Sequence, residues 1–352
     1  MNIFNRIFKT KREDRYDNRR INQIRCDRNE KVSDWEQYII NKIYKTISKR
    51  EFTAYFDQKK INNISLKVAR YLNISVENFC YFHGGDSVIR DFILFNYKKN
   101  LSTCINDLNY QMYDVYLDSL KIKLKKIKYI YDYNSLNLFY FDKEQFYKTI
   151  PEVDIIFHTN PNQVSNLDFT VNEFEKILKK WKRKIFFIDE SYHGFGHTSL
   201  ISLVKKYKNI YVLRSVTKSF GMAPHRIGFL IGHKNNILKF KAFQTPYPLS
   251  LFSGKILEYF LKNMKLIKNY QLNVRKGRDF LCEGLRKKGF RINNSLGNSI
   301  NIEFENKINM KKKYHLLMKK NIITKQNVYY KKFYLRVTCD ERKVMKKILE
   351  NF

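Results

Sequence analysis

Short apolar runs alternate with amphipathic stretches through the middle of the chain. Six of the runs are rich in β-branched and aromatic residues and are predicted to be strands: residues 78–84, 127–133, 153–160, 184–191, 209–216 and 226–232. The third and fourth runs are almost continuously apolar, which is typical of strands buried on both faces. Between two runs, residues 171–184 place Phe174, Ile177 and Leu178 at helical spacing. This alternation predicts an α/β fold in which helices cover a mostly parallel sheet.

The pattern changes near residue 251. Residues 251–290 are predicted to form long helices, and short strands follow in NSINIEFE and FYLRVTC. The two prolines of TPYPL, residues 245–249, lie near the change and suit a hinge or a crossover. We therefore expect a second, smaller α+β domain over residues 251–352.

Composition adds a strong positive charge to this picture. The chain of 352 residues carries 68 Lys and Arg against 33 Asp and Glu, a formal charge of +35, with 43% hydrophobic and 16% aromatic residues. Such a hydrophobic content can bury a sizeable core and excludes a wholly disordered chain. The charge first suggests nucleic acid or an anionic membrane surface. Because the basic residues are spread along the whole length, we favour compositional bias, or an anionic small-molecule ligand, and do not expect a nucleic-acid partner.

Cysteine usage and the absence of long apolar segments indicate the compartment. The five cysteines are far apart and form no CxxC motif or Cys/His cluster, which indicates a reducing environment and no metal site. The first twenty residues lack the apolar run of a signal peptide, and no segment reaches the roughly 18 apolar residues of a membrane span. We expect a cytoplasmic protein that does not insert in a membrane.

Polar residues follow four of the predicted strands. The segments are HGGDS at 83–87, NPNQVSN at 160–166, DESYHGF at 189–195 and SVTKSFGMAPHR at 215–226. In an open α/β sheet the ligand lies at the carboxyl ends of the strands, so these segments are expected to converge. Together they offer amides, an acid with a tyrosine, hydroxyls with a lysine and an arginine, and a glycine turn that opens a helix. This set can hold a phosphorylated aromatic cofactor.

These segments resemble the motifs of fold-type-I pyridoxal-phosphate enzymes. SVTKSFGMAPHRIG is similar to their lysine motif, FIDESYHGF to their Asp-Glu-Ala-Tyr segment, and NPNQVSN to NPNNPTG. Four further segments match in the order of the family, closest to the histidinol-phosphate aminotransferases: IRCDRNEK (24–31), TAYFDQ (53–58), NYQMYDVY (109–116) and FYLRVTCDE (333–341). The resemblance implies the cofactor pyridoxal 5'-phosphate.

The resemblance also implies a domain organisation. An N-terminal arm, residues 1–45, would contribute to the small domain and the substrate pocket. Residues 46–250 would form the cofactor-binding large domain around a mostly parallel seven-stranded sheet. Residues 251–352 would form the small α+β domain.

The resemblance assigns roles around the cofactor ring. Lys218 would form the Schiff base and later move the proton at Cα. Asp189 would keep the pyridine nitrogen protonated. Tyr192 would donate to the phenolic oxygen of the cofactor, joined by Asn162. Gln163 occupies the position that aligns with the asparagine of the family, so either side chain is a candidate for that contact.

The resemblance also assigns the ring-stacking and phosphate contacts. Tyr110 matches the aromatic residue that stacks on the ring, and Tyr113 is a plausible substitute. A helix N-terminus that follows a glycine turn suits a phosphate. The expected phosphate ligands are Gly85, Asp86, Ser87, Ser215, Thr217, Arg226 and, from the neighbouring subunit of a homodimer, Tyr55.

For the substrate, the resemblance points to an anion. Arg336 matches the arginine that pairs with the α-carboxylate. Lys325 lies where the family has a second arginine for the substrate phosphate. Asn29 would lie at the mouth of the same pocket. The expected substrate is therefore a small anionic amino compound.

Three functions remain open at this point. The first is an aminotransferase that moves an amino group between a small amino acid or amino phosphate and a 2-oxo acid or oxo phosphate. The second is a decarboxylase of a phosphorylated amino acid such as phosphoserine or phosphothreonine, because both reactions begin with the same bound substrate. The third is a binding protein that retains the fold without catalysis, which the altered NPNQVSN segment suggests.

Overall fold

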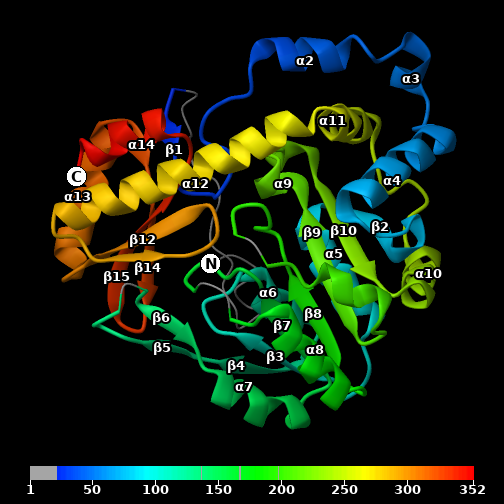
Figure 1. Cartoon of the computed structure of the whole chain (residues 1–352), viewed down its shortest axis with the longest axis horizontal. Helices are drawn as coiled ribbons and strands as arrows, with labels where there is room; N and C mark the ends of the chain where they lie inside the picture. The colour runs from blue at the N-terminus through cyan, green and yellow to red at the C-terminus, as the bar shows by residue number, and fades with distance from the viewer. Residues whose placement is uncertain (1–21, 136, 166–167, 197) are drawn as a thin grey trace.

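A seven-stranded sheet forms the centre of the larger part of the chain (Figure 1). The computed structural model describes residues 22–135, 137–165, 168–196 and 198–352. The strand order is β2-β10-β9-β8-β7-β3-β4, and β10 alone runs antiparallel to its neighbours among these strands. The strands are β2 (Phe79–His83), β3 (Ser102–Asn106), β4 (Lys123–Ile127), β7 (Ile155–Thr159), β8 (Ile185–Asp189), β9 (Ile210–Ser215) and β10 (Ile227–Gly232). The expected mostly parallel seven-stranded sheet is confirmed.

Helices cover both faces of this sheet because successive strand residues point to opposite sides. Phe186 and Ile188 of β8 pack on one face with α4, α8 and α11, whereas Phe187 packs on the other with α5, α6 and α10. The helices of this part are α2 (Gln37–Tyr44), α3 (Lys49–Thr53), α4 (Gln58–Leu72), α5 (Gly84–Phe95), α6 (Met112–Ser119), α7 (Lys143–Thr149), α8 (Val171–Lys180), α9 (Val216–Ser219), α10 (Lys234–Phe243) and α11 (Leu251–Lys262). Short 3₁₀ turns cover Val76–Asn78, Ile150–Glu152, Ile201–Lys205 and Ala223–His225.

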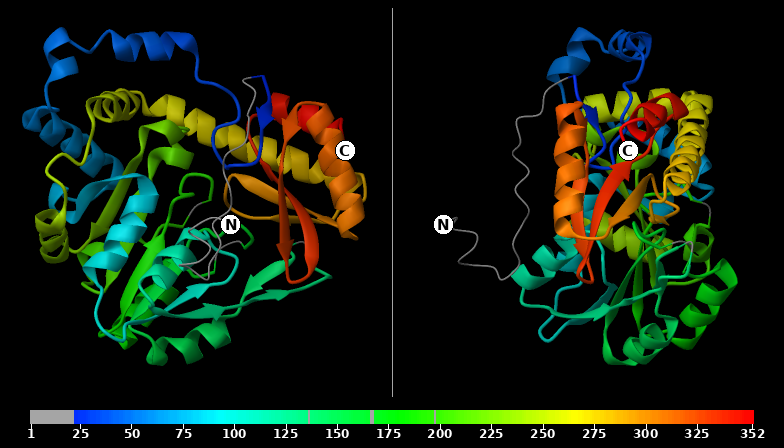
Figure 2. Two further views of the ribbon diagram at one scale, coloured as in Figure 1. Left: turned by 180° about the vertical axis from the view of Figure 1, so that it is seen from behind. Right: turned by 90° about the vertical axis from the view of Figure 1, so that its left-hand side faces the viewer.

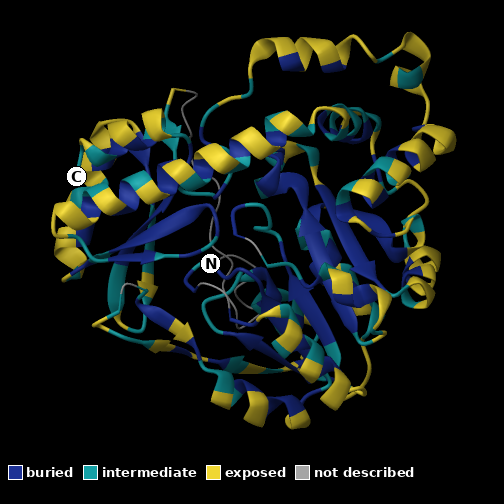
Figure 3. Ribbon diagram, viewed as in Figure 1, coloured by how far each residue is buried: buried dark blue, intermediate teal, exposed yellow. Residues whose placement is uncertain are grey.

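Helix α8 shows how local sequence and packing agree. Thr170 and Glu173 form a capping box at its start, and Phe174, Ile177 and Leu178 are buried. Each such buried side chain contributes about 1.5–3 kcal/mol to folding. Figure 3 shows the result across the molecule: the central strands of the large sheet are buried and the outward faces of the helices are exposed. The predicted helix over 171–184 is therefore confirmed, although it ends at Lys180.

Two strands of the large sheet differ from the sequence prediction. The predicted strand over 127–133 is wrong as a single element: β4 ends at Ile127, and β5 (Tyr129–Tyr131) pairs instead with β6 (Phe139–Phe141) in a separate hairpin. Strand β4 carries three lysines, as suits an edge strand, so its sequence lacks an apolar run. Strand β3 was not predicted because Ser102, Thr103 and Asn106 make it polar, yet it lies between β7 and β4.

A second, antiparallel sheet lies in the C-terminal part. Its order is β11-β12-β15-β14, formed by β11 (Ile292–Asn294), β12 (Ser299–Phe304), β14 (Lys325–Tyr329) and β15 (Lys332–Thr338). The accompanying helices are α12 (Met264–Lys287), α13 (Lys307–Lys319) and α14 (Arg342–Leu349). The expected α+β character of this part is confirmed.

The N-terminal segment packs on both parts of the chain. Strand β1 (Ile24–Arg25) pairs in parallel with β13 (Ile322–Ile323), and Cys26 joins the core of the C-terminal part. Further on, Ile39 and Ile43 of α2 join the core of the larger part. Figure 2 shows α2 and α3 at the outer edge of the molecule, beyond α11. The segment thus runs from one core to the other, across the ends of the central strands.

Candidate active site

The predicted site residues converge at one edge of the large sheet. Strands β2, β7, β8 and β9 end there, and β10 begins there, because Ile227 pairs with His83 and Gly228 with Ser215. The segments 83–87, 160–165, 189–192, 215–218 and residue Arg226 therefore meet, as expected from the strand directions. Asn166 lies outside the described residues.

Lys218 lies on α9, directly after β9. Its side chain is half-buried, and its Nζ donates to the main-chain oxygen of Arg28 at 2.7 Å. The main-chain oxygen of Lys218 accepts from the hydroxyl of Tyr270 at 3.3 Å, which ties the loop to α12. Ser215 caps α9 by accepting from the N–H of Thr217 at 3.2 Å. The Ser215 cap and the contact with α12 thus fix the position of Lys218 at this edge of the large sheet.

Asp189 ends β8 and is buried. Burial raises the pKa of its carboxyl, and the hydrogen bonds from Ser191 and Tyr113 act in the opposite direction. The Tyr113 hydroxyl donates to Oδ2 at 3.0 Å and the Ser191 N–H donates to Oδ1 at 2.9 Å. A buried carboxylate of this kind is stabilised by a nearby cation, such as a protonated pyridine nitrogen.

Gly84 and Arg226 form the corner where α5 begins. Gly84 has φ +78°, and a Cβ on it would lie 2.6 Å from Nη2 of Arg226, so the guanidinium lies directly over the glycine turn. Arg226 itself is exposed, with φ +46°. Gly228 packs equally closely, because a Cβ added to it would lie 2.6 Å from the main-chain carbonyl carbon of Gly84. The sequence of this corner places a planar cation beside the N-terminus of a helix.

The same corner contains buried polar atoms that suit a phosphate. The Oγ1 of Thr217 is buried and has no hydrogen-bond partner among the described residues. Gly85 and Ser87 lie in the first turn of α5, where main-chain N–H groups point outward. Ser87 donates to the oxygen of His83, and Asp86 accepts from the hydroxyl of Tyr116 at 2.9 Å. We call Gly84–Ser87, Asp189, Ser215–Lys218 and Arg226 the cofactor side. Its hydrogen-bond donors fit the phosphate of pyridoxal phosphate, and the carboxyl of Asp189 fits the ring nitrogen.

A second group of side chains closes the other half of the edge. The Tyr192 hydroxyl oxygen accepts from Nδ2 of Asn29 at 2.8 Å and from Nε2 of Gln163 at 3.1 Å. The Oε1 of Gln163 accepts from Nη1 of Arg336 at 2.8 Å. Arg336 is buried on β15, and its Nη2 donates to the main-chain oxygen of Asp27 at 2.5 Å. We call Asn29, Gln163, Tyr192 and Arg336 the substrate side.

Of the two amide side chains that the sequence left open, Gln163 is the one that bonds to Tyr192. Nδ2 of Asn162 donates to Thr159 at 2.7 Å, and its Oδ1 accepts from the N–H of Val164 at 2.9 Å. The Asn162 side chain is thus used within its own loop, whereas Gln163 extends to Tyr192. Which of the two side chains contacts the cofactor remains a prediction.

The remaining predicted residues lie at different distances from this centre. Lys325 is half-buried and pairs with Arg336 across β14 and β15. Tyr110 is half-buried in the segment between β3 and α6. Tyr55 is 77% exposed and stacks on Tyr247, with ring centroids 4.1 Å apart. Within one chain, Tyr55 therefore lies on the surface and is not brought to the cofactor side.

One buried ion pair was missed by the sequence analysis. Nε of Arg214 donates to Oε2 of Glu190 at 2.8 Å, and both side chains are almost fully buried. Ser199 bridges the pair from the following loop. Each charged residue directly adjoins a predicted site residue, Asp189 or Ser215, so the pair fixes the loop after β8 against the end of β9. The sequence did offer a signal for this pair, because Glu190 and Arg214 are charged residues at the ends of strands that are otherwise apolar.

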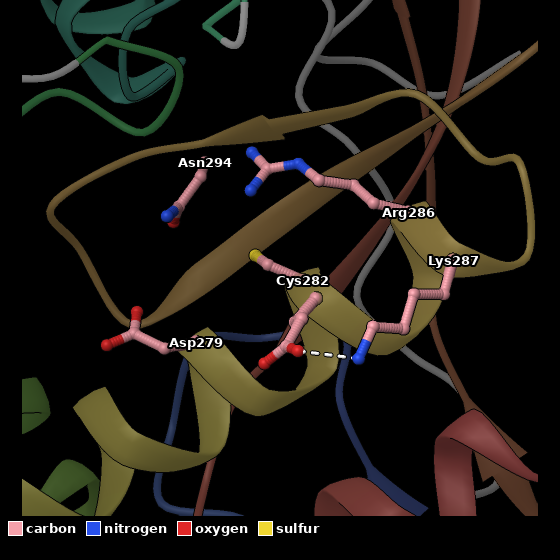
Figure 4. A pocket seen from close by; sticks show the side chains of 6 residues that line it. Asp279, Cys282, Arg286, Lys287 and Asn294 are labelled. Atoms are coloured by element: carbon pink, nitrogen blue, oxygen red, sulfur yellow. Dashed lines mark ion pairs between the residues drawn. The ribbon is translucent and has the colours of Figure 1, made fainter.

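Figure 4 shows a pocket that lies elsewhere, between α12 and β11. It is lined by Asp279, Cys282, Glu283, Arg286, Lys287 and Asn294. Glu283 and Lys287 form an ion pair at 2.7 Å, and burial raises the pKa of the Cys282 thiol to about 11, so the thiol is unreactive near neutral pH. None of these residues belongs to the predicted site.

Comparison with known proteins decides the family. A family model described as aminotransferase class I and II matches residues 21–352. The chain belongs to the class I and II aminotransferases. Pyridoxal phosphate is the cofactor of these enzymes, and the structure of a histidinol-phosphate aminotransferase from Sinorhizobium meliloti contains it. The predicted family is confirmed.

The curated relatives that match this chain include histidinol-phosphate aminotransferases. That of Clostridium kluyveri is 26% identical over 94% of this chain and 92% of its own length. Those of Sulfurisphaera tokodaii and Clostridium botulinum are 26% and 29% identical over 68% and 66% of this chain. The match spans 66% and 64% of those two relatives, slightly less than two thirds of their length.

Solved structures share the fold of this chain. The Sinorhizobium meliloti enzyme has a TM-score of 0.80 at 14% identity, covering 93% of this chain and 89% of that one. The histidinol-phosphate aminotransferase of Clostridium acetobutylicum has a TM-score of 0.80 at 22% identity, covering 93% and 97%. L-threonine-O-3-phosphate decarboxylase from Porphyromonas gingivalis has a TM-score of 0.73 at 14% identity, covering 93% and 98%. The fold is therefore common to enzymes named for different reactions.

Two negative findings apply to the described part of this chain. Within it, no helix has both the length and the apolar character that crossing a bilayer requires. Nor do three or more His, Cys, Asp or Glu side chains gather there into a group suited to a metal ion.

Proposed function

We propose that the protein transfers an amino group between a small anionic amino compound and a 2-oxo acid or oxo phosphate, with Lys218 as the reactive amine. The observation that carries this proposal is the placement of Lys218 at the sheet edge between a buried acid, Asp189, and a corner with free donors for a phosphate. Bound pyridoxal phosphate supplies an aldehyde that condenses with amines and a ring that accepts electrons.

The residues of the chain would supply everything else. The Lys218 amine removes and returns the proton at Cα of the substrate. Asp189 holds a proton on the ring nitrogen, and Tyr113 and Ser191 keep its carboxylate in place. Arg226, Thr217 and the first turn of α5 bind the phosphate.

Arg336 and Lys325 support an anionic substrate. They occupy paired positions on neighbouring strands, and Arg336 is buried. A buried guanidinium favours a carboxylate because its planar fork makes two parallel hydrogen bonds. The second cation suits a second anionic group, such as a phosphate.

Decarboxylation of a phosphorylated amino acid is the second candidate reaction. It uses the same cofactor and the same anion-binding residues, so Arg336 and Lys325 support it equally. The two reactions differ in which bond at Cα breaks, which depends on the bond that lies perpendicular to the cofactor ring.

A homodimer is also proposed. Six large side chains are exposed on and beside the N-terminal helices and α11: Tyr38, Tyr44, Phe52, Tyr55, Tyr247 and Phe252. An apolar surface of this kind is typical of an interface. A second copy placed there would cover Tyr55 and bring it toward the phosphate of its partner. Sedimentation should then give twice the mass of one chain.

The first experiment is spectroscopic. The purified protein should take up pyridoxal phosphate and become yellow, and borohydride reduction should attach the cofactor to Lys218, as located by peptide mass spectrometry. A protein that binds no cofactor, and to which borohydride attaches none, would contradict every catalytic proposal and leave only a binding protein.

The second experiment separates the reactions. Histidinol phosphate, phosphoserine and a panel of amino acids are incubated with the loaded protein. Conversion of the cofactor to its amine form supports amino transfer, whereas release of carbon dioxide supports decarboxylation.

A further inference from the structure

The pocket between α12 and β11 brings together charged groups that the candidate active site does not use (Figure 4). Its volume is about 470 Å³, within the range of about 300–1,000 Å³ that small-molecule sites occupy. Helix α12 contributes Asp279, Cys282, Glu283 and Arg286, whose spacing places them on one face of the helix, and β11 contributes Asn294. Acidic and basic side chains therefore line one cavity.

Arg286 and Asn294 carry hydrogen-bonding groups that the described residues leave unused. The side chain of Arg286 is exposed, and its guanidinium forms no hydrogen bond or ion pair with another described residue. Oδ1 of Asn294 is buried and has no partner among the described residues. Figure 4 shows the guanidinium, the amide and the sulfur of Cys282 turned toward the same space. Because buried polar atoms are normally satisfied, this arrangement points to a ligand.

The two acids of the pocket differ in how they are engaged. Glu283 pairs with Lys287 at 2.7 Å, so these two charges largely neutralise each other. The carboxylate of Asp279 lies 3.5 Å from Nε of Arg278, which is longer than a charged hydrogen bond, and its side chain is 66% exposed. Nη1 of Arg278 donates instead to the main-chain oxygen of Gly297 at 2.6 Å. The carboxylate of Asp279 can therefore accept from another donor.

We propose that this pocket binds a small zwitterion such as a free amino acid, with the ligand's carboxylate on Arg286 and its ammonium between Asp279 and Oδ1 of Asn294. The planar fork of a guanidinium suits a carboxylate, and the three donors of an ammonium suit a carboxylate with an amide oxygen. This binding does not depend on the proposed function, because no residue of the pocket belongs to the cofactor side or the substrate side.

The size of an amino acid fits the spacing of these groups. Arg286 and Asp279 lie two turns apart on α12, about 10.5 Å along the axis. The long side chain of Arg286 leans toward the N-terminus of the helix, which shortens the gap between the two charges. The charged groups of an α-amino acid are about 3 Å apart, and a charged hydrogen bond of about 2.8 Å at each end extends the ligand's reach to about 8–9 Å. Both contacts can therefore form at once.

The mixture of charges sets the specificity. A ligand with only a negative charge would meet Asp279 and Glu283, and a ligand with only a positive charge would meet Arg286 and Lys287. Either ligand would bring like charges together, which a zwitterion avoids. The buried thiol of Cys282 offers an apolar surface between the two ends. We therefore expect tight binding to require both charges of the ligand.

The test compares three probes of nearly the same shape. N,N-dimethylglycine is a zwitterion, 3-methylbutanoate lacks the ammonium, and N,N-dimethylglycinamide lacks the carboxylate. None has a primary amine, so none forms a Schiff base with pyridoxal phosphate. Affinities are measured by ligand-observed NMR titration at pH 7 with the full chain in the presence of pyridoxal phosphate. N,N-dimethylglycine should bind at least about tenfold more tightly than either of the other probes.

The reference for these titrations carries Arg336→Ala, so that the substrate side does not contribute to the binding of a carboxylate. If Arg336→Ala does not fold, Arg336→Gln takes its place. On this background, Arg286→Gln should weaken binding of N,N-dimethylglycine at least about tenfold, and Asp279→Asn about three- to tenfold. Both positions are exposed, so neither change disturbs the core. Lys276→Gln is the matched control, because it removes a positive charge from α12 outside the pocket, and it should bind as the reference does.

A preference for the zwitterion that is lost in Arg286→Gln and Asp279→Asn, and kept in Lys276→Gln, would support the proposal. Four results would overturn it. They are no detectable binding of N,N-dimethylglycine, equal affinities for N,N-dimethylglycine and 3-methylbutanoate, equal affinities in Arg286→Gln and Lys276→Gln, or an affinity in Asp279→Asn equal to that of the reference.

Discussion

The cofactor side and the substrate side of the site differ in how their polar groups are satisfied. On the cofactor side, Thr217 keeps a buried oxygen without a described partner, and Arg226 lies exposed over Gly84. On the substrate side, Gln163 bonds to both Tyr192 and Arg336, and Nε of Arg336 is buried without a described partner. The first half offers an exposed cation and a hydroxyl to an anion, whereas the second is bonded mostly within itself and keeps one unused donor.

This difference parallels the motifs. The lysine segment that forms much of the cofactor side departs from its family where Ala-Pro-His-Arg replaces Ala-Gly-Leu-Arg, and NPNQVSN on the substrate side departs from NPNNPTG over most of its second half. We infer that separate residues bind the cofactor and select the substrate. Each prediction below tests that separation.

Replacing the amine should have the largest effect. Lys218→Ala should lower turnover at least about 10³-fold, because it removes the group that moves the Cα proton. It should still bind the phosphate of the cofactor and a carboxylate. Turnover and cofactor retention on gel filtration would be measured, with the exposed Lys239→Ala as the control. Turnover near that of the control would break the assignment of the cofactor side.

The two arginines provide the direct test of the comparison. Arg226→Ala should weaken cofactor binding about 10- to 100-fold, and Arg336→Ala should raise KM for an anionic substrate by a similar factor, because each loses charged hydrogen bonds of about 1.5–3 kcal/mol. Cofactor affinity is measured by absorbance and KM by steady-state kinetics. If each variant changed both quantities equally, the two halves would not be separate.

Glycine 84 should show a smaller effect. Gly84→Ala places a Cβ 2.6 Å from Nη2 of Arg226, so the guanidinium must move and cofactor affinity should fall about tenfold. Gly289→Ala is the matched control. Gly289 also has a positive φ, +81°, but no neighbouring heavy atom lies within 4 Å of a Cβ placed on it. Both changes strain the backbone by about 1 kcal/mol, and only the first should weaken cofactor binding. Equal affinities in the two variants would contradict the role of the corner.

The smallest effect concerns the support of the substrate side. Asp168 lies beneath the Gln163 loop, where Ser165 donates to it at 2.9 Å, and burial raises the pKa of its carboxyl to about 7. The folded state then binds this proton more tightly than the unfolded state, whose pKa is ordinary, so stability falls as pH rises from about 4 to about 7. Asp168→Asn lacks this loss, so its stability relative to the wild type should rise over this pH range, by at most about 1.4 kcal/mol for each pH unit.

Urea unfolding at pH 5 and pH 7.5 would measure this gain. The advantage of Asp168→Asn should be larger at the higher pH, while cofactor affinity stays unchanged. An advantage that is equal at both values would show that the carboxyl titrates normally. The buried His158, 3.4 Å from Asp168, is present in both proteins, and burial lowers its pKa to about 3.

Much of the fold was predictable because it depends on local patterns. Five of the six predicted strands lie in the large sheet, where their apolar runs are buried on both faces. Strands β3 and β4 were not predicted, because Asn106 in β3 and the lysines of β4 interrupt the apolar runs that indicate a buried strand. Pairing of β3 with β7, and of β4 with β3, extends the sheet even without such runs. The domain boundaries at residues 45 and 250 remain predictions.

The sequence alone determined which chemical groups meet at the sheet edge. Lys218, Asp189 and Arg226 each adjoin a strand end, and the direction of parallel strands brings such positions together whatever lies between them. Only the tertiary structure decided the connections among side chains. Gln163 rather than Asn162 reaches Tyr192, and Arg336 meets Gln163, because contacts between residues 173 positions apart depend on how two sheets pack. No local sequence pattern indicates how the two sheets pack, so these contacts could not be predicted from the sequence.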